Sequence, residues 1–191
     1  MTPLELKKKL RRALFGYGTQ RVARKGLRRA AVLVPLLLKE GSLHVLLIKR
    51  SAGLPQHAGE IAFPGGRVEP RDASPRETAL REAFEEVGLD PRDVEIVGRL
   101  NEVVTRTRFL VTPFVGIVPY PYPFRADGRE AERLLLLPLE CFGREKATER
   151  PWGGQKVLFY HLGPHTVWGA TAQILTELVE LLTSSRILCT R

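Results

Sequence analysis

The stretch FPGGRVEPRDASPRETALREAFEEVGL, residues 63–89, decides the fold of this 191-residue chain. A Gly-Gly turn leads through an acidic loop into a helix, for which Ser74 is suited as N-cap and Pro75 as first helical residue. Apolar residues recur from Ala79 to Val87, and Gly88 is suited to the C-terminal cap. The stretch therefore predicts one continuous turn–loop–helix unit.

Three glutamates, Glu82, Glu85 and Glu86, lie within five positions of this helix. Residues three or four apart share a helix face, so the spacing predicts carboxylates on one side and apolar side chains buried on the other. The residues expected to be buried are Leu80, Ala83, Phe84 and Val87. Uncompensated glutamate pairs cost a few tenths of a kcal/mol each, which a hard divalent cation would remove. Without a Cys/His set, Mg²⁺ or Mn²⁺ is favoured, while a solvated acidic face is the ordinary alternative.

The stretch resembles the Nudix box, the signature of a hydrolase family. The box has a glycine, five residues, Glu, seven residues, then Arg-Glu, an apolar residue, any residue, Glu-Glu, any residue, Gly and an apolar residue. Here Asp72 follows Gly66 after five residues, and eight residues separate Asp72 from Arg81. The half from Arg81 to Leu89 is intact. The inserted residue falls in a loop, where one more residue adds little to the entropy cost of closing the loop. The resemblance implies an α/β (α+β) fold, a Nudix-like α/β/α sandwich with a mixed β-sheet between helices.

The preceding segment, LLIKRSAGLPQHAGEIAFPGG (46–66), resembles the upstream signature of the coenzyme A pyrophosphatase (CoA diphosphatase) branch of this family. The matching residues are Arg50, Ser51, His57, Gly59, Phe63, Pro64, Gly65 and Gly66. Ile48 replaces a usual threonine and Pro55 a common arginine, and residues 103–109 lack the usual Ser-Gly. Including similar segments at 109–116 and 167–175, the resemblance covers about residues 29–183.

This resemblance implies metal-dependent hydrolysis of the diphosphate bond of coenzyme A, or of its derivatives, to 4′-phosphopantetheine and adenosine 3′,5′-bisphosphate. Diphosphate oxygens are anionic and repel hydroxide unless cations neutralise them, which agrees with a carboxylate-rich site. ADP-ribose, NADH, a dinucleotide or a nucleoside triphosphate is an alternative substrate. A non-catalytic Nudix-fold module that binds a nucleotide or RNA is an alternative of another class.

Carried over to this sequence, the family pattern implies Glu82 and Glu86 as principal metal ligands, with the Gly65 carbonyl as an additional ligand. Glu85 would bind a further metal or take the proton from the attacking water. Many family members take a further acid from a distant loop, for which Glu130 and Glu132 are equal candidates here.

The supporting residues implied by the family pattern are Arg81, Asp72 and Gly66. Arg81 would orient the acids by pairing with Asp72 or Glu85, because arginine presents a rigid planar fork. Asp72 is one methylene shorter than glutamate, so we expect it to reach Arg81 less well. The substrate-binding candidates, all in the upstream signature, are Arg50, Ser51, His57 and Phe63. Arg50 would bind a phosphate or simply end a strand in water, and His57 would bond loop backbone or act as a base.

Apolar runs separated by turns predict the remaining elements. Strands are expected at residues 29–38, 43–50, 61–63, 94–100, 109–118 and 156–162, with a further buried segment at 134–139. Residues 171–182 have helical periodicity, and Leu6, Leu10 and Leu14 predict a short helix lying on the body. The pattern favours a mixed sheet covered by helices on two faces.

The net charge of +9 is concentrated at the N-terminus, where residues 1–29 contain ten Lys/Arg and one acid. Such a segment can attract phosphates, nucleic acid or an anionic membrane, or can be a solvated helix face with a linker. No aromatic ladder or zinc spacing accompanies it, so a nucleic-acid partner is not favoured. We expect a basic helix and linker at 1–28, a Nudix hydrolase domain at 29–183 and a tail at 184–191.

Cys141 and Cys189 are the two cysteines of the chain. So few cysteines argue against a disulfide framework and favour a reducing cytoplasm. The longest apolar runs, residues 30–38 and 134–139, are too short to span a bilayer. The expected partner is therefore a small nucleotide-diphosphate substrate, with a homodimer left open.

Overall fold

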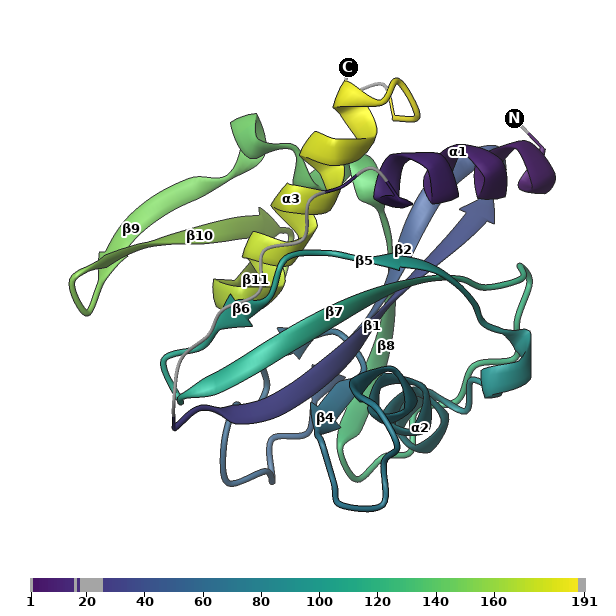
Figure 1. Ribbon diagram of the computed structural model, residues 1–191. Helices are drawn as coiled ribbons and strands as arrows, with labels where there is room; N and C mark the ends of the chain where they lie inside the picture. Colours follow the sequence, from purple (N-terminus) through teal and green to yellow (C-terminus); the bar gives the residue numbers. More distant parts are fainter. Residues whose placement is uncertain (1, 16, 18–25, 189–191) are drawn as a thin grey trace.

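The computed structural model describes residues 2–15, 17 and 26–188 of the chain (Figure 1). The helices are α1 (Pro3–Phe15), α2 (Pro75–Val87) and α3 (Gly169–Ser184), with short 3-10 turns η1 (Pro91–Asp93), η2 (Leu139–Phe142) and η3 (Arg144–Lys146). The strands are β1 (Arg28–Lys39), β2 (Ser42–Arg50), β3 (Ile61–Ala62), β4 (Gly65–Arg67), β5 (Glu95–Arg99), β6 (Val103–Val104), β7 (Phe109–Ile117), β8 (Ala131–Pro138), β9 (Thr148–Trp152), β10 (Gln155–Leu162) and β11 (His165–Trp168). Cys189 and most of the expected linker lie outside the described residues.

The main sheet is mixed, as the sequence predicts. Its strand order is β3-β2-β1-β7-β5, with β4 paired to β1, β6 to β7 and β8 to β2. The pairing of β1 with β7 is parallel, whereas β1 pairs with β2 and β4 antiparallel. The strands expected at residues 29–38 and 43–50 form the β1–β2 hairpin, and Glu40 and Gly41 at its turn both have positive φ, which suits the twist of a tight hairpin.

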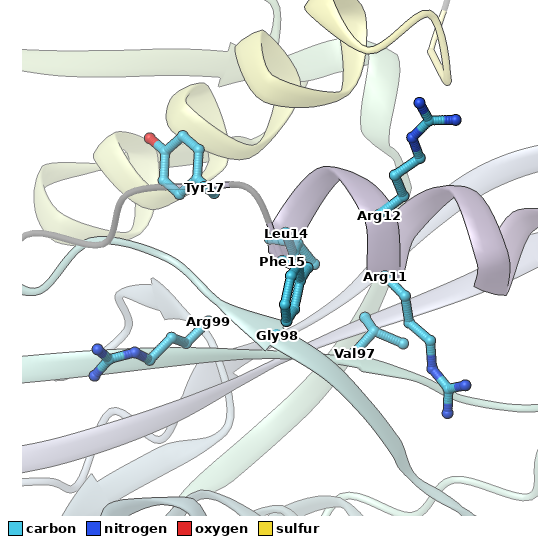
Figure 2. Close-up of a pocket in the computed structure, with 8 residues that line it drawn as sticks. All are labelled: Arg11, Arg12, Leu14, Phe15, Tyr17, Val97, Gly98 and Arg99. Carbon is cyan, nitrogen blue, oxygen red and sulfur yellow. The ribbon is translucent and has the colours of Figure 1, made fainter.

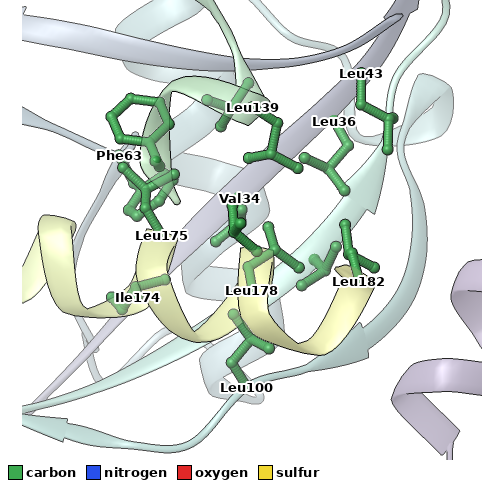
Figure 3. Packing of buried hydrophobic residues seen from close by; sticks show 14 of the residues in the cluster. Val34, Leu36, Leu43, Phe63, Leu100, Leu139, Ile174, Leu175, Leu178 and Leu182 are labelled. Carbon is green, nitrogen blue, oxygen red and sulfur yellow. The ribbon is translucent and has the colours of Figure 1, made fainter. Parts of the chain in front are cut away.

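Alternation along β1 separates two apolar cores. Val34 and Leu36 point to the side that carries α1 and α3, and Figure 3 shows Val34, Leu36 and Leu178 in this core. Leu33 and Leu37 point to the opposite side, where α2 packs. Helices therefore cover both faces of the sheet, which confirms the α/β/α arrangement expected from the sequence.

Helix α1 belongs to the body of the molecule. Leu6, Leu10 and Leu14 are at most 4% exposed and lie in the same core as α3, as their spacing predicts. Gly98 on β5 permits this contact, because a side-chain carbon there would lie 2.5 Å from Leu14 Cβ. Lys7 and Arg11 pair with Glu95, so part of the basic face of α1 is tied to β5.

The second sheet is small and antiparallel, with strand order β11-β10-β9 beside α3 (Figure 1). Of its strands only β10 is predicted by the sequence, as are β1, β2, β3, β5 and β7 of the main sheet. None of the helices in the described ranges combines the length and the apolar character of a membrane-spanning helix.

Candidate active site

Helix α2 has the ends that its sequence predicts. Ser74 has extended backbone and its side chain accepts a hydrogen bond from the Glu77 N–H, while Pro75 occupies the first turn. Gly88 closes the helix in the left-handed region at φ 68°. The unit from the Gly-Gly turn to the helix cap is therefore formed as expected.

The buried face of α2 differs from the one expected. Phe84 is 54% exposed, whereas Glu86 is only 2% exposed. The buried stripe runs through Ala79, Ala83, Glu86 and Val87, because the two alanines bring the helix close to the sheet and leave no room for a phenyl ring. The expectation that Phe84 is buried, with all three glutamates on the outer face, is wrong.

The Gly-Gly turn forms β4 and lies between β1 and α2. A side-chain carbon at Gly65 would lie 2.5 Å from the Ala31 carbonyl oxygen, and one at Gly66 would overlap the Glu82 carboxylate. Close approach of backbone therefore requires glycine at position 65, whereas a side chain at position 66 would displace the Glu82 carboxylate. The Gly65 N–H donates to Glu86 Oε2 at 2.9 Å, which holds the glutamate against the turn.

Glu86 is a buried carboxylate with one oxygen unsatisfied. Among the described residues, Oε1 accepts no hydrogen bond, and the nearest cation, Arg50 Nη1, lies 3.7 Å away. Burial raises the pKa of Glu86 to about 8, and the charge of Glu82 adds to the rise, while the Gly65 N–H and Arg50 oppose it. The site thus contains a carboxyl group whose ionised form the described residues leave under-compensated.

Arg81 forms both pairings that the sequence leaves as alternatives. Its Nε and Nη2 donate to the two oxygens of Asp72 at 2.9 and 3.1 Å, and its Nη1 donates to Glu82 at 2.9 Å and Glu85 at 3.0 Å. The expectation that Asp72 reaches Arg81 less well is wrong. A tight turn, in which the Asp72 N–H donates to the Glu69 carbonyl, carries the shorter side chain to the arginine.

The side chain of Asp72 is covered by its hydrogen-bond partners in this arrangement. Besides Arg81, it accepts from the Thr78 hydroxyl at 2.8 Å and the Glu69 N–H at 2.9 Å. The hydrogen bonds from Arg81 hold the pKa of Asp72 well below its usual range, against the opposing effect of burial. Asp72 therefore fixes the arginine fork, which in turn aims Glu82 and Glu85.

Arg81 occupies the carboxylates of Glu82 and Glu85, so these are not gathered into a cation cage. Across the described part of the chain, no group of three His, Cys, Asp or Glu side chains is arranged to hold a metal ion. The side chain of Glu82 is 12% exposed, and burial raises its pKa although Arg81 opposes the rise. A cation would have to draw Glu82 and Glu85 away from Arg81, whereas Glu86 Oε1 is already free of hydrogen bonds.

Glu130 and Glu132, the two candidates for the remote acid, differ in the residues with which they interact. Glu132 pairs with Lys49 at 3.1 Å on the sheet. Burial chiefly raises the pKa of Glu82 and Glu86, and the charge of Glu130 adds to both rises. Asp127, which sequence reasoning missed, ties this loop to α2, because its N–H donates to the Glu86 carbonyl and its carboxylate accepts from the Glu130 N–H.

Known proteins are similar to this chain in sequence and in fold. The sequence profile of the NUDIX domain matches residues 27–152. The chain belongs to the Nudix family. The uncharacterized Nudix hydrolases NudL of Salmonella paratyphi B and Escherichia coli K12 (DH10B) are 41% and 40% identical over 156 residues, which cover 79% of this chain and 81% of each relative.

Solved Nudix structures share the fold at low sequence identity. The Nudix hydrolase RenU of M. smegmatis aligns with a TM-score of 0.58 at 21% identity, covering 86% of this chain and 90% of that one. A MutT/nudix family protein of Enterococcus faecalis aligns with a TM-score of 0.57 at 20% identity, covering 96% and 75%. The mixed sheet between helices is therefore the Nudix fold.

The upstream candidates lie at different distances from the Nudix helix α2. Arg50 ends β2 beside Glu86, and the Ser51 N–H donates to the Glu130 carbonyl at 2.9 Å. His57, with φ 58°, pairs through Nδ1 with Glu60 at 3.0 Å within its own loop. These contacts bring Arg50 and Ser51 next to the acidic site and use the His57 ring to close the loop.

Phe63 packs in the core instead of facing the site. Its side chain is 3% exposed, and Figure 3 shows it beside Leu175 of α3. This leaves almost no surface for a ligand to contact, so Phe63 anchors the chain just before the Gly-Gly turn.

A separate cavity of about 650 Å³ lies between α1 and β5, on the other side of the sheet from the Nudix helix (Figure 2). It is lined by Arg11, Arg12, Leu14, Phe15, Tyr17, Val97, Gly98 and Arg99. None of the carboxylates of the Nudix box lines it, so this cavity is not the candidate active site.

Proposed function

We propose that this Nudix hydrolase is a metal-dependent diphosphatase that cleaves coenzyme A, or a coenzyme A derivative, to 4′-phosphopantetheine and adenosine 3′,5′-bisphosphate. The observation that carries the proposal is the buried Glu86 carboxylate, which has an oxygen without a hydrogen bond beside the Gly65 turn. Membership of the Nudix family supports hydrolysis. The similarity of residues 46–66 to the upstream signature supports coenzyme A as substrate.

The donor set fits Mg²⁺ or Mn²⁺, because it consists of hard oxygen atoms around the Glu86 carboxylate, one oxygen of which accepts no hydrogen bond from the described residues. Glu82 and Glu86 would be the principal ligands, with Glu85 and the Gly65 carbonyl completing the set. When bound, such a cation neutralises the diphosphate oxygens and polarises the phosphorus that is attacked.

Substrate binding, proton transfer and orientation of the acids would fall to different protein residues. Arg50 carries a positive charge beside Glu86, so it can hold a substrate phosphate at the site. Glu85 is the most solvent-accessible acid of the set, at 48% side-chain exposure, and can accept the proton of the attacking water. Arg81 and Asp72 would keep the helix acids aimed, and Glu130 is the better placed remote acid.

The substrate can be tested by comparing turnover of coenzyme A, NADH and ADP-ribose side by side with Mg²⁺ and with Mn²⁺. We expect the highest kcat/KM with coenzyme A. Equal or better turnover of ADP-ribose would overturn the assignment of coenzyme A as the substrate, while the assignment as a hydrolase would stand. Among solved structures, a C. elegans Ap4A hydrolase shares the fold at a TM-score of 0.51 and 21% identity, so a dinucleotide belongs in the same panel.

A non-catalytic binding module is the alternative of another class. It would show no metal-dependent turnover of any diphosphate in the panel. The complete set of Glu82, Glu85 and Glu86 argues against it, because a binding module has no need of a buried, under-compensated carboxylate.

A further inference from the structure

A continuous row of rings crosses the small sheet. Phe159 on β10 stacks on Trp168 of β11, with centroids 5.8 Å apart and planes inclined by 4°. Trp152 on β9 lies 5.8 Å from Trp168, and His161 stacks at 6.4 Å and 11° on Phe159. We refer to Trp152, Phe159, His161 and Trp168 as the aromatic row.

The aromatic row occupies the outer face of this sheet. Side chains alternate along a strand, so Tyr160, between Phe159 and His161, points the other way. Tyr160 is buried under α3, where its hydroxyl bonds Thr176 and the Phe142 carbonyl. Trp152 is 52% exposed and His161 is also exposed, so the row faces away from the core.

On the face of the row, the described strands β9, β10 and β11 place positive charge and no carboxylate. Thr148 pairs with Phe159 across the strands and so shares the face, as Arg150 does two residues later. The Arg150 guanidinium lies 5.8 Å from the centre of the Phe159 ring. Glu149 lies on the opposite face, where Arg144 and Lys156 neutralise it. Planar rings next to arginine, without an acid, suit a planar ligand that carries phosphate.

The small sheet borders the segment that leads into the acidic site. Strand β11 packs beside β3, and β3 continues through Phe63 into the Gly65–Gly66 turn. At its far end the β9–β10 hairpin meets the β6–β7 loop, because a side-chain carbon on Gly153 would overlap the Arg106 guanidinium. The small sheet thus contacts the segment that precedes the Gly65–Gly66 turn at one end and the loop that precedes β7 at the other.

We propose that the aromatic row is the surface that stacks on the nucleobase of the substrate, with Arg150 facing the phosphate of that nucleotide half. The inference rests on the proposed function and deepens it, because it names the nucleotide half as the part of the substrate that the small sheet recognises. Stacking on rings tolerates any base, so the row provides binding while the Nudix helix provides the chemistry.

The two tryptophans of the chain, Trp152 and Trp168, both lie in the row, so intrinsic fluorescence reports on it directly. Metal-free protein is titrated with adenosine 3′,5′-bisphosphate and, separately, with inorganic pyrophosphate. We expect saturable quenching by the nucleotide and none by pyrophosphate. Phe159→Ala should weaken nucleotide binding at least tenfold. Tyr120→Ala, at a 42% exposed ring outside the small sheet, is the matched control and should change nothing.

Arg150→Ala tests the same face without removing a ring. Because the Arg150 side chain is exposed, this variant should fold even if the ring variants do not. It should weaken binding of adenosine 3′,5′-bisphosphate about fivefold or more and leave binding of adenosine unchanged. Absence of quenching, or equal effects of Phe159→Ala and Tyr120→Ala, would overturn the proposal. Binding of a single-stranded oligoadenylate that is at least a hundredfold tighter than the mononucleotide would also overturn it, in favour of a nucleic-acid surface.

Turnover separates this inference from the proposed function. If both hold, Phe159→Ala raises KM at least tenfold with kcat within about twofold, and Glu86→Gln abolishes turnover without changing the quenching. Turnover of coenzyme A without quenching by the nucleotide would refute the proposed role of the aromatic row, while the proposed diphosphatase activity would stand. Quenching in a protein without turnover would support the row as a nucleotide-binding surface and refute the diphosphatase.

Discussion

Glu86 couples the stability of the metal-free protein to pH. Its pKa is about 8 in the folded state and about 4.3 in an unfolded chain, so the folded protein binds this proton more tightly. Stability therefore falls as pH rises from about 4.5 to about 8, because over this range the unfolded chain releases a proton that the folded protein still holds, and it levels off once Glu86 is ionised in both states. Glu86→Gln removes that charge, and we expect the variant to exceed the parent by about 2–4 kcal/mol at pH 8.5 and to match it at pH 5.

Urea unfolding in a chelator at both pH values measures this difference. Glu132→Gln is the matched control, because the Glu132 side chain is 43% exposed, and it should follow the parent at each pH. A Glu86→Gln variant that is no more stable than the parent at pH 8.5 would show that Glu86 is not a buried charge.

Arg81 compensates another buried acid, Asp72, whose side chain is 2% exposed. Arg81→Met leaves this carboxylate without its fork and should destabilise the protein by about 3–5 kcal/mol at pH 7. Because the pKa of Asp72 is depressed, the penalty should shrink as pH falls below about 4, where the acid of the unfolded chain becomes protonated.

Chemical denaturation of Arg81→Met at pH 7 and pH 3.5 checks this prediction. Arg92→Met, at an 89% exposed arginine paired with Asp90, should cost less than about 0.5 kcal/mol. A similar cost for both variants would contradict the assigned role of Arg81.

Sequence reasoning located the acids of the site but not their burial. The Arg81–Leu89 pattern is local, so Glu82, Glu85 and Glu86 could be identified without a structure. Amphipathic reasoning treats charge as a sign of exposure, and it therefore placed Glu86 outside and Phe84 inside. Only the contacts with β4 and with the Asp127 loop, both distant in sequence, reverse that assignment.

At the scale of elements, the two glycines of β4 differ in what an added side chain would contact. Gly65→Ala puts a carbon 2.5 Å from the Ala31 carbonyl and 2.7 Å from Val32 Cα, so backbone must move. Gly66→Ala meets only the Glu82 carboxylate, which can rotate. We expect Gly65→Ala to cost about 2–4 kcal/mol of stability. Gly66→Ala should cost less than about 1 kcal/mol but weaken Mn²⁺ binding about tenfold or more.

Thermal unfolding together with Mn²⁺ titration distinguishes the two variants. Equal stability losses, or Mn²⁺ binding by Gly66→Ala that equals the parent, would contradict the placement of Glu82 against the turn.

Elements with a long run of periodic apolar residues were predictable, whereas of the short strands only β3 was. The β1–β2 hairpin, β7 and α3 each contain enough periodic apolar residues to be predicted from their own sequence. Strands β4 and β6 have only three and two residues and exist because a neighbour pairs with them. Strand β9 is exposed throughout, so it has no apolar alternation to detect.

At the scale of the whole molecule, α1 shares the core of the Nudix domain. Leu10 is fully buried there, so Leu10→Ala should destabilise the entire protein by about 2–5 kcal/mol in one cooperative transition. Leu4→Ala, at a 62% exposed residue of the same helix, should stay within about 0.5 kcal/mol of the parent. Urea unfolding followed by circular dichroism measures both. Parent-like stability of Leu10→Ala would mean that the helix is a dispensable appendage.

The most direct measurement is identification of the products after incubation of the protein with coenzyme A and Mg²⁺ or Mn²⁺, in parallel with Glu86→Gln. The proposed function predicts 4′-phosphopantetheine and adenosine 3′,5′-bisphosphate in equal amounts, dependence on the metal, and loss of at least about 10³-fold in kcat for the variant. Hydrolysis by Glu86→Gln at the parent rate, or no metal-dependent cleavage of coenzyme A by the parent, would contradict it.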